Sequence, residues 1–395
     1  MNAACCSRLS STVGRRLSTA LSTTGRRFLS RKPLYADVDN FSAVSREHTA
    51  QFVKLSETAV EDLGLCQRAA PAGIRAQVET FGEGALMVRQ SSADLLEVLN
   101  GFNPGQESLR VMVHGNRGSG KTLTVLQAAC WAYARPQWVV LHVCNAIRWH
   151  RNPFEYAPSP TEEGMVDQPP EAAELLYEFH KANGPKGPLL ESLLCQRERR
   201  FESTLVVGVG DSIAKLVDVG LHNRQHSCAA VGGLLEELRL AATAGRCSVL
   251  VSVDDINAFF GPVKKWKFKP IHVPPREKLT LNRDFVKLFQ AEWQNGVIVG
   301  SAGGKAQRGK LQFRLKPHQL RDLLELDASG IDALDPFVPV AVDNYTAEEA
   351  EACLEYYLHH KWLQHPGAQS RRGRQQLAHL SGFNPDLMER ICAPL

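Results

Sequence analysis

The sequence lacks any long hydrophobic run and any regular cysteine spacing, and each absence excludes a class of protein. No uninterrupted apolar stretch of the chain approaches the roughly 20 residues that a transmembrane helix needs, so a helical membrane anchor is excluded. The ten cysteines include no C-x-x-C pair, which leaves a zinc ribbon or a disulfide framework without support. Buried free thiols in a reducing compartment are the expected alternative.

Acidic residues are absent from the N-terminal segment, since the first one in the chain is Asp37. The same segment carries seven Arg or Lys residues and many Ser and Thr residues. A segment rich in Arg and Ser and poor in acids is typical of an organelle transit peptide. Residues 1–36 are therefore predicted to be a mitochondrial transit peptide. The alternative is a basic arm that stays on the mature protein and touches RNA.

Removing this segment changes the charge balance of the protein. The whole chain has 46 Lys and Arg against 42 Asp and Glu, and taking away the seven basic residues leaves 39 against 42. A net charge near −3 excludes a basic coat for nucleic acid, so any RNA contact has to be local. Two basic stretches, residues 261–278 and 303–321, are the places where such contacts are expected. The alternative for each is a solvated loop.

The most informative stretch is a glycine-rich turn that follows an apolar run and precedes an apolar helical pattern. Residues 115–122 match G-x-x-x-x-G-K-[ST] in the strand-to-helix context that the motif requires. Glycines let consecutive backbone N–H groups point at an anion, and the following helix adds its positive end. Lys121 supplies a cation for the terminal phosphates, and the Thr122 hydroxyl suits Mg²⁺. The alternative is a turn that binds nothing. The predicted nucleotide-binding residues here are Gly115, Asn116, Arg117, Gly118, Ser119, Gly120, Lys121 and Thr122.

A second landmark is an apolar strand that ends in two acids, Asp254 and Asp255. An acid at this place lies beside the water shell of the metal, so Asp254 is predicted to organise Mg²⁺, through water, together with Thr122. Hydrolytic P-loop ATPases with an extra strand in the sheet commonly have a glutamate at the next position, which activates water. Asp255 is predicted to belong to the nucleotide-binding site with Asp254. It is one methylene shorter than glutamate, so binding is better supported than turnover and no residue is given a catalytic role. Ser301, at the end of another apolar strand, is predicted to sense the terminal phosphate.

The remaining pattern predicts an α/β fold with a five-stranded parallel sheet of the P-loop NTPase type and a C-terminal helical lid. Further strands are expected at residues 138–143, 297–300 and 337–342, and a capping box at Thr346 and Glu349 is expected to start a lid helix. The acidic residues between positions 162 and 178 are expected to form a solvated face. The predicted domains are an N-terminal arm at 37–77, a nucleotide-binding domain at 78–343 with an insertion at 151–212, and the lid at 344–395.

The strand arrangement looks like the AAA+ and STAND branch of P-loop NTPases, and blocks outside the loop give a closer resemblance. From about residue 80 to the C-terminus the chain resembles the death-associated protein three family, the GTP-binding protein of the mitochondrial ribosomal small subunit. The blocks that carry it, in order, are Trp138 with Leu141-His142 and Trp149, Asp167-Gln-Pro-Pro-Glu-Ala172, Val253-Asp-Asp-Ile-Asn-Ala258, Asp332-Ala-Leu-Asp-Pro-Phe337, Asn344-Tyr345, Tyr356-Tyr-Leu358 with Trp362-Leu363, and Asn384-Pro385.

The resemblance implies a structural constituent of the mitochondrial ribosome that supports mitochondrial translation in the matrix. It implies GTP or GDP with Mg²⁺ as ligand, neighbouring small-subunit proteins and rRNA as partners, contact with the large subunit, and a link to apoptosis in animals. The chain departs from its relatives at Asp255, where they have glycine. The guanine preference has no support from an N-K-x-D motif, which the sequence lacks.

A second hypothesis is that the protein is an enzyme. The chain would then be a free mitochondrial AAA+ or STAND ATPase whose hydrolysis drives remodelling or apoptotic signalling. Sedimentation separates the two hypotheses, because a ribosomal component travels with the small subunit and a free ATPase does not.

Overall fold

The structure is a computed structural model that describes residues 34–67, 70, 72–151, 153–260, 274–303, 326 and 328–393. The predicted transit peptide lies outside the described residues except for its last three positions. Both basic stretches, 261–278 and 303–321, lie outside them except for residues 274–278 and 303. None of the described helices is long and apolar enough to cross a bilayer.

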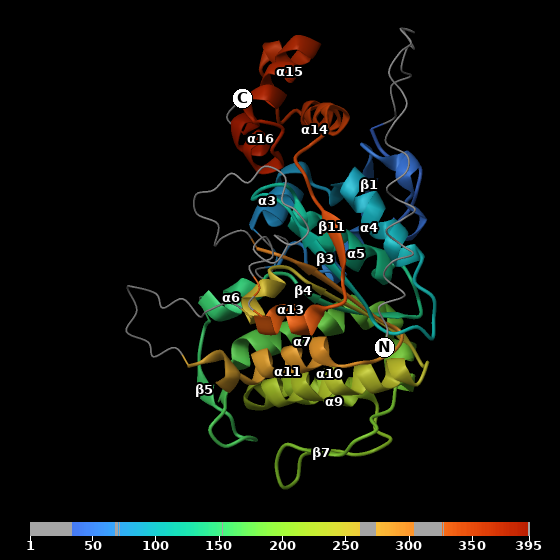
Figure 1. Ribbon diagram of the computed structural model, residues 1–395, viewed down its shortest axis with the longest axis vertical. Helices are drawn as coiled ribbons and strands as arrows, with labels where there is room; N and C mark the ends of the chain where they lie inside the picture. The colour runs from blue at the N-terminus through green and yellow to red at the C-terminus, as the bar shows by residue number, and fades with distance from the viewer. Residues whose placement is uncertain are drawn as a thin grey trace. The chain divides into compact units, whose positions relative to one another are not determined.

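The centre of the fold is a parallel five-stranded sheet with strand order β11-β3-β10-β9-β4 (Figure 1). The predicted α/β class with a five-stranded parallel sheet is confirmed. Strand β10 lies between the strand that leads into the phosphate-binding loop and the strand that precedes Asp254. The strands are β3 (Leu109–His114), β4 (Trp138–Val143), β9 (Ser248–Val253), β10 (Gly296–Ser301) and β11 (Val338–Ala341).

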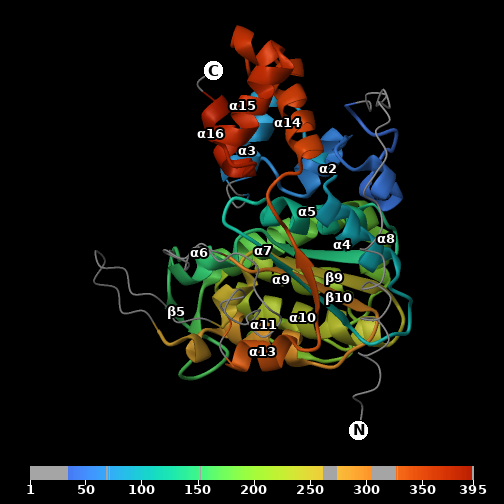
Figure 2. The same cartoon turned by 45° about the horizontal axis from the view of Figure 1, so that its top comes forward.

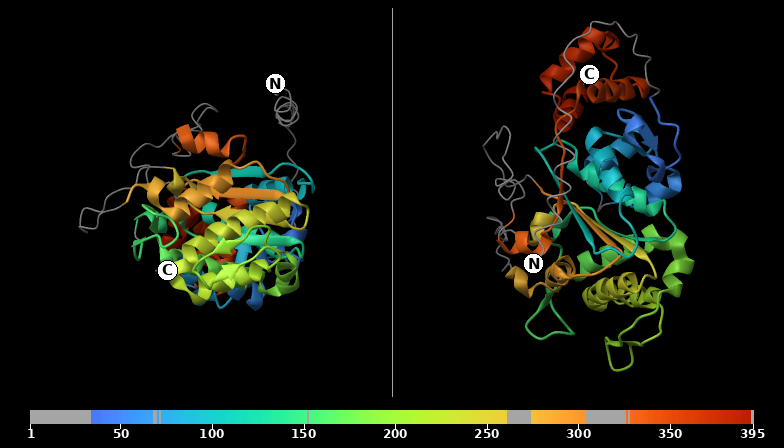
Figure 3. Two further views of the ribbon diagram at one scale, coloured as in Figure 1. Left: turned by 90° about the horizontal axis from the view of Figure 1, so that it is seen from below. Right: turned by 45° about the vertical axis from the view of Figure 1, so that its right-hand side comes forward.

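Helices cover both faces of this sheet because the strands are apolar on both sides. Within β4, Val140 packs in one cluster with α4 and α5, whereas Val139 and Leu141 pack in a second cluster with α7, α9 and α10. The two groups of helices lie on opposite sides of the strands in the right panel of Figure 3. The bounds are α4 (Gln90–Asn100), α5 (Lys121–Tyr133), α6 (Ala146–Arg151), α7 (Pro169–Asn183), α8 (Gly187–Ser192), α9 (Ile213–His222), α10 (Ser227–Thr243), α11 (Thr280–Gln290) and α13 (Ala328–Leu334).

The region predicted as an N-terminal arm contributes to the core of the fold. Strand β1 (Phe52–Lys54) pairs antiparallel with β2 (Ala85–Met87), and Phe41 and Val53 are fully buried in the cluster that holds α4 and α5. The short helices of this region are η1 (Phe41–Ala43), η2 (Arg46–His48), α2 (Glu57–Asp62) and α3 (Ala72–Phe81).

The prediction that the acidic residues of the insertion form a solvated face is wrong for two of them. Asp167 is 1% exposed and Glu171 is fully buried. Asp167 precedes α7 and Glu171 lies in its first turn. Because α7 packs against β4, both carboxylates are enclosed and accept hydrogen bonds from protein groups instead of water. Asp167 accepts a hydrogen bond from Thr280 Oγ1 at 2.6 Å, and Glu171 accepts one from the backbone N–H of Phe154 at 2.6 Å. The insertion also contains the two-residue pairs β5 (Ala157–Pro158) with β6 (Val166–Asp167) and β7 (Arg199–Arg200) with β8 (Val206–Val207).

The C-terminal lid consists of α14 (Ala347–His359), α15 (Arg371–Leu380) and α16 (Pro385–Cys392). These helices lie together, beside α2 and α3, in Figure 2. The predicted capping box is confirmed, since Thr346 and Glu349 exchange side-chain and backbone hydrogen bonds at the start of α14. Tyr356 stacks on Phe52 with ring centroids 4.2 Å apart, so the lid packs on the small β1–β2 sheet.

The cysteines behave as small apolar side chains, as expected. Of the eight in the described part of the chain, seven are buried free thiols and Cys66 is exposed. Burial raises the pKa of Cys130 to about 12, so this thiol stays protonated and unreactive at neutral pH.

Candidate phosphate-binding site

The phosphate-binding loop, residues 115–122, connects β3 to α5 and is shaped by its glycines. Gly118 has φ 75° and Gly120 has φ 105°, which is the left-handed region that side chains disfavour. At Gly115 a Cβ atom would collide with the carbonyl oxygen of Val342. The motif therefore has glycine at positions where this backbone path and this packing exclude other residues.

The loop has the polar groups that an anion requires. Helix α5 begins at Lys121, and the N–H groups of its first turn have no intrahelical partner. Ser119 is fully buried, and its hydroxyl oxygen has no hydrogen-bond partner among the described residues. Because buried polar groups are almost always paired, this arrangement fits a polyphosphate.

Lys121 brings a cation to the loop itself. The residue is 8% exposed, and its Nζ donates to the carbonyl oxygens of Gly115 at 2.9 Å and Asn116 at 2.8 Å. The ammonium group is thereby fixed beside the loop, where it can meet phosphate oxygens without a large search of rotamers.

The hydroxyls of Thr122 and Ser301 both reach the carboxylate of Asp254. Thr122 Oγ1 donates to one carboxylate oxygen at 2.9 Å, and Ser301 Oγ donates to the other at 2.5 Å. Burial raises the pKa of Asp254 to about 7, the charge of Asp255 adds to the rise, and the two hydroxyls and Lys121 oppose it. A buried carboxylate held next to a threonine hydroxyl fits Mg²⁺, which prefers hard oxygen ligands.

Asp255 occupies an unusual backbone position. Its φ of 62° lies in the left-handed region, which costs a non-glycine residue roughly 1 kcal/mol or more. Its N–H donates to Ser301 Oγ at 3.0 Å. Its carboxylate lies against Gly303, where an added Cβ would collide with Asp255 Oδ1. The position therefore suits the glycine that the resemblance implies.

Replacing Asp255 separates the effect of this backbone conformation from that of its charge. Asp255→Ala and Asp255→Gly both remove the carboxylate, but only glycine relaxes the positive φ. We expect the Gly variant to have a free energy of unfolding about 1 kcal/mol higher than the Ala variant, with nucleotide affinity within about threefold of the wild type in both. Urea denaturation and nucleotide titration measure the two quantities. Equal stability of the two variants would contradict the backbone argument.

The raised pKa of Asp254 gives a pH dependence with a definite sign. Because the pKa in the folded protein, about 7, exceeds the usual value of 3.8, the metal-free protein loses stability as pH rises through about 7. Between about pH 5.5 and about pH 8.5 the expected loss is about 2 kcal/mol. Urea denaturation in EDTA, with Asp254→Asn as control, measures it. The partly buried Glu178 also has a pKa of about 7, raised by burial, but it is present in both proteins and cancels. A wild type no more pH-sensitive than Asp254→Asn would contradict the assignment.

The structure brings the residues singled out from sequence to one edge of the sheet. Asp254, Asp255 and Ser301 follow or end β9 and β10, beside the phosphate-binding loop that follows β3. Asn116 and Arg117 are exposed at the rim. Three residues in this region went unrecognised from sequence as parts of the site. They are Arg89, Glu349 and Asn384. Glu349 was expected only as part of a capping box, and Asn384 stood in one of the blocks that carry the family resemblance.

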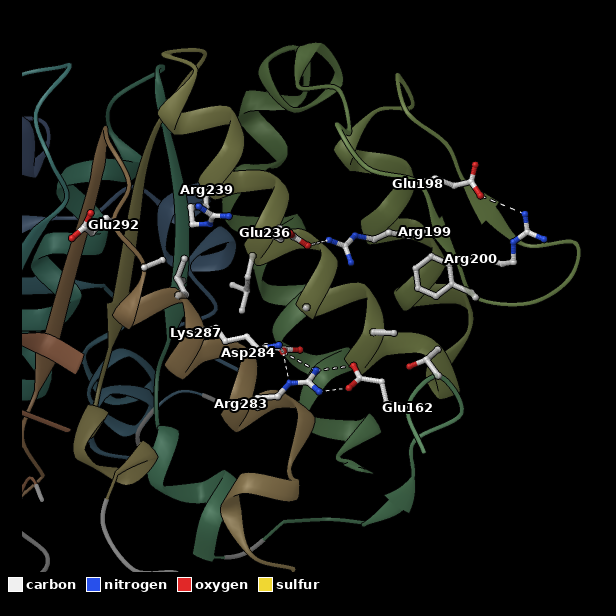
Figure 4. A pocket seen from close by; sticks show the side chains of 17 residues that line it. Glu162, Glu198, Arg199, Arg200, Glu236, Arg239, Arg283, Asp284, Lys287 and Glu292 are labelled. Carbon is white, nitrogen blue, oxygen red and sulfur yellow. Dashed lines mark hydrogen bonds and ion pairs between the residues drawn. The ribbon is translucent and has the colours of Figure 1, made fainter. Parts of the chain in front are cut away.

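A cavity of about 590 Å³ lies elsewhere, along α10 and α11 and next to β7. Figure 4 shows that the charged residues on its walls largely pair with each other. Arg283 contacts Glu162 and Asp284, and Arg199 contacts Glu236. Because its charges are neutralised internally, this cavity shows no preference for an anion, and the loop remains the stronger candidate site.

Comparisons with known proteins place this chain in a family. A family model described as "Mitochondrial ribosomal death-associated protein 3" matches residues 86–391. Two proteins named "Small ribosomal subunit protein mS29", from Mus musculus and Bos taurus, are each 33% identical to the chain over 319 residues. The match covers 81% of this chain and 79% and 78% of theirs. A solved Walker-type ATPase of Pyrococcus abyssi aligns at 13% identity and a TM-score of 0.39, over 76% of this chain and 64% of that one.

Proposed function

The chain belongs to the family of mitochondrial ribosomal death-associated protein 3, and on this basis we propose that it is a structural constituent of the mitochondrial ribosomal small subunit. We propose further that it holds a guanine nucleotide, GTP or GDP with Mg²⁺, in the phosphate-binding loop. The observation that carries the second part is the Thr122–Asp254–Ser301 cluster beside that loop. A glycine-rich turn that binds nothing has no need of a buried carboxylate at this place.

Each residue of the site has a role in this proposal. The loop amides bind phosphate oxygens, and Lys121 neutralises the terminal phosphates. Thr122 and Asp254 hold the magnesium ion, the Asp through water, and the ion adds positive charge where the phosphates are most negative. Among the described residues no group of three or more His, Cys, Asp or Glu side chains is arranged to hold a metal. The phosphates would therefore supply part of the magnesium coordination.

The site favours holding the nucleotide over hydrolysing it. A general base has to reach the attacking water, and the residue after Asp254 is an aspartate whose side chain lies against Gly303. Its backbone N–H is engaged by Ser301 at 3.0 Å. We therefore propose a bound nucleotide that acts as a structural ligand, with hydrolysis absent or slow.

The relatives' names place those proteins in a ribosomal small subunit, and we propose the same location for this chain, in the mitochondrial matrix. Its partners are then neighbouring small-subunit proteins and rRNA, with a contact to the large subunit. The near-neutral mature charge fits a largely protein-facing position. The basic stretches 261–278 and 303–321 supply the local charge for RNA.

Co-sedimentation tests the assignment against a free ATPase. The tagged chain, expressed in mitochondria and run on a sucrose gradient at physiological salt, is expected to sediment with the small subunit and to turn over GTP and ATP at well below about 1 per second. Recovery at the top of the gradient, together with turnover at or above that rate, would favour the free AAA+ or STAND ATPase.

A further inference from the structure

Three consecutive carbonyl groups of the phosphate-binding loop accept hydrogen bonds from outside the loop. The carbonyl oxygen of Arg117 accepts one from Asn384 Nδ2 at 3.0 Å, and that of Gly118 accepts one from the N–H of Asp386 at 3.1 Å. The carbonyl oxygen of Ser119 accepts one from Arg89 Nη1. Two of the three donors belong to the start of α16 in the lid.

These contacts fix the direction of the loop amides. In a trans peptide the C=O of one residue and the N–H of the next point in opposite directions. Because the three carbonyls point at Asn384, Asp386 and Arg89, the N–H groups of the following residues point away from these donors. Ser119 N–H turns back to the Asn116 carbonyl at 3.3 Å. The N–H groups of Gly118 and Gly120 therefore face away from these donors, and N–H groups that share one side of a loop are what binds an anion.

The lid lies directly on the loop at Gly118. A Cβ atom at this glycine would come within 2.7 Å of Asp386 Cβ and 2.8 Å of Asn384 Oδ1. Such distances leave no room between the two segments. A change in the path of the loop therefore has to move the start of α16, and a displaced α16 removes two of the three contacts that hold the loop.

Asn384 and Arg89 also form hydrogen bonds that connect them to other parts of the lid and to the segment before it. Asn384 caps α16 by accepting from the N–H of Leu387 at 3.1 Å, and its Nδ2 also reaches Asn344 Oδ1 at 3.2 Å. Arg89 donates to the Asp343 carbonyl at 2.7 Å and to Glu349 of α14 at 3.3 Å. Thus the blocks Asn344-Tyr345 and Asn384-Pro385, far apart in the sequence, meet at the outer side of the phosphate-binding loop.

We propose that Asn384 and Arg89 are positioning residues for the nucleotide and that the lid preorganises the phosphate-binding loop through them. The inference rests on the proposed nucleotide binding and adds how that binding is controlled. Docking of the lid and occupancy of the loop stabilise each other, and the coupling is reciprocal. A partner that pulls on the lid therefore releases the nucleotide, and a bound nucleotide fastens the lid.

Asn384→Ser tests the positioning role without removing the cap. Serine caps a helix about as well as asparagine, but its side chain is too short to donate to the Arg117 carbonyl. In the full mature chain, titration with a fluorescent GDP analogue is expected to show about tenfold weaker binding, mainly through faster dissociation. The melting temperature is expected to stay within about 2 °C of the wild type.

Ser370→Ala is the matched control in the same lid. Ser370 caps α15 by accepting from the N–H of Gly373 at 3.0 Å, so its loss destabilises the lid away from the loop. We expect a lower melting temperature and GDP affinity within about twofold of the wild type. Loss of affinity in Ser370→Ala equal to that in Asn384→Ser would show a general stability effect and overturn the positioning role.

Hydrogen exchange on the wild type tests, without any variant, whether a bound nucleotide stabilises the docked lid. Saturating GDP with Mg²⁺ is expected to slow exchange at the start of α16, including the Asp386 N–H, by about tenfold. Suppose that the wild type binds GDP, that Asn384→Ser binds it equally well, and that exchange in α16 does not change. This result would overturn the inference and leave the proposed function standing. A wild type that binds no nucleotide would overturn both.

Discussion

Lys121→Ala is expected to weaken binding of GDP and GTP by about 100-fold, or about 2.7 kcal/mol. Lys121 is 8% exposed, and its ammonium group is held by the carbonyls of Gly115 and Asn116, so its charge acts on the phosphates where water screens it poorly. Alanine removes the cation together with its two hydrogen bonds to the loop carbonyls. Isothermal titration of the purified mature chain with GDP and Mg²⁺ measures the change.

Lys287→Ala is the matched control for this titration. Its side chain is 66% exposed and lies on the wall of the cavity next to α10, away from the phosphate-binding loop. Removal of the same charge there is expected to leave GDP affinity within about twofold, because exposed charges are screened by water and salt. Unchanged affinity in Lys121→Ala would contradict the assignment of the loop as the nucleotide site.

Glu349→Ala is expected to lower the free energy of unfolding by about 3–5 kcal/mol. Glu349 is 1% exposed and accepts hydrogen bonds from Arg89, from the N–H of Gln90 at 2.9 Å and from the N–H of Thr346 at 3.0 Å. Alanine leaves the buried guanidinium without its counter-charge and two N–H groups without an acceptor. Urea denaturation measures the loss.

A double-mutant cycle separates the ion pair from the loss of packing. In an Arg89→Met background the cost of Glu349→Ala is expected to fall by about 2 kcal/mol, because no buried cation remains to be stranded. Glu348→Ala, in the exposed first turn of the same helix, is the control and is expected to cost no more than about 1 kcal/mol. Equal costs at positions 348 and 349 would contradict the buried network.

The parts of the site that were predictable from sequence are those specified locally. The phosphate-binding loop and Asp254 each follow an apolar strand and Ser301 ends one, and parallel strands bring their carboxyl ends to one edge of the sheet. The capping box at Thr346 and Glu349 is likewise a pattern of adjacent positions. Short-range rules were therefore enough for the sheet and for the groups that we assign to the phosphates.

The parts that sequence reasoning missed depend on contacts between distant segments. Arg89 lies 30 residues from Ser119 and 260 from Glu349, and no periodicity marks such a pair. Glu349 was recognised as a helix cap, but its second task as the counter-charge of Arg89 arises only when the lid docks. Glu171 was taken for a solvated charge because its helix is acidic, whereas tertiary packing encloses it.

The proposed coupling gives a reason for a nucleotide that is bound but not consumed. The lid is held by its packing on the β1–β2 sheet, and its two hydrogen bonds to the glycine-rich loop add only about 1 kcal/mol net each. A polyphosphate that fixes the loop strengthens both contacts at once. In a ribosomal particle such a ligand would stabilise the docked lid, with no need for a hydrolytic cycle.

The most direct test is the identity and amount of nucleotide in the purified native particle. Small subunits that carry the wild-type chain or Lys121→Ala are isolated on gradients, extracted with acid and analysed for nucleotides by chromatography. The proposed function predicts about one additional guanine nucleotide per particle in the wild type, absent from the variant. Equal nucleotide content in the two particles, or adenine in place of guanine, would contradict it.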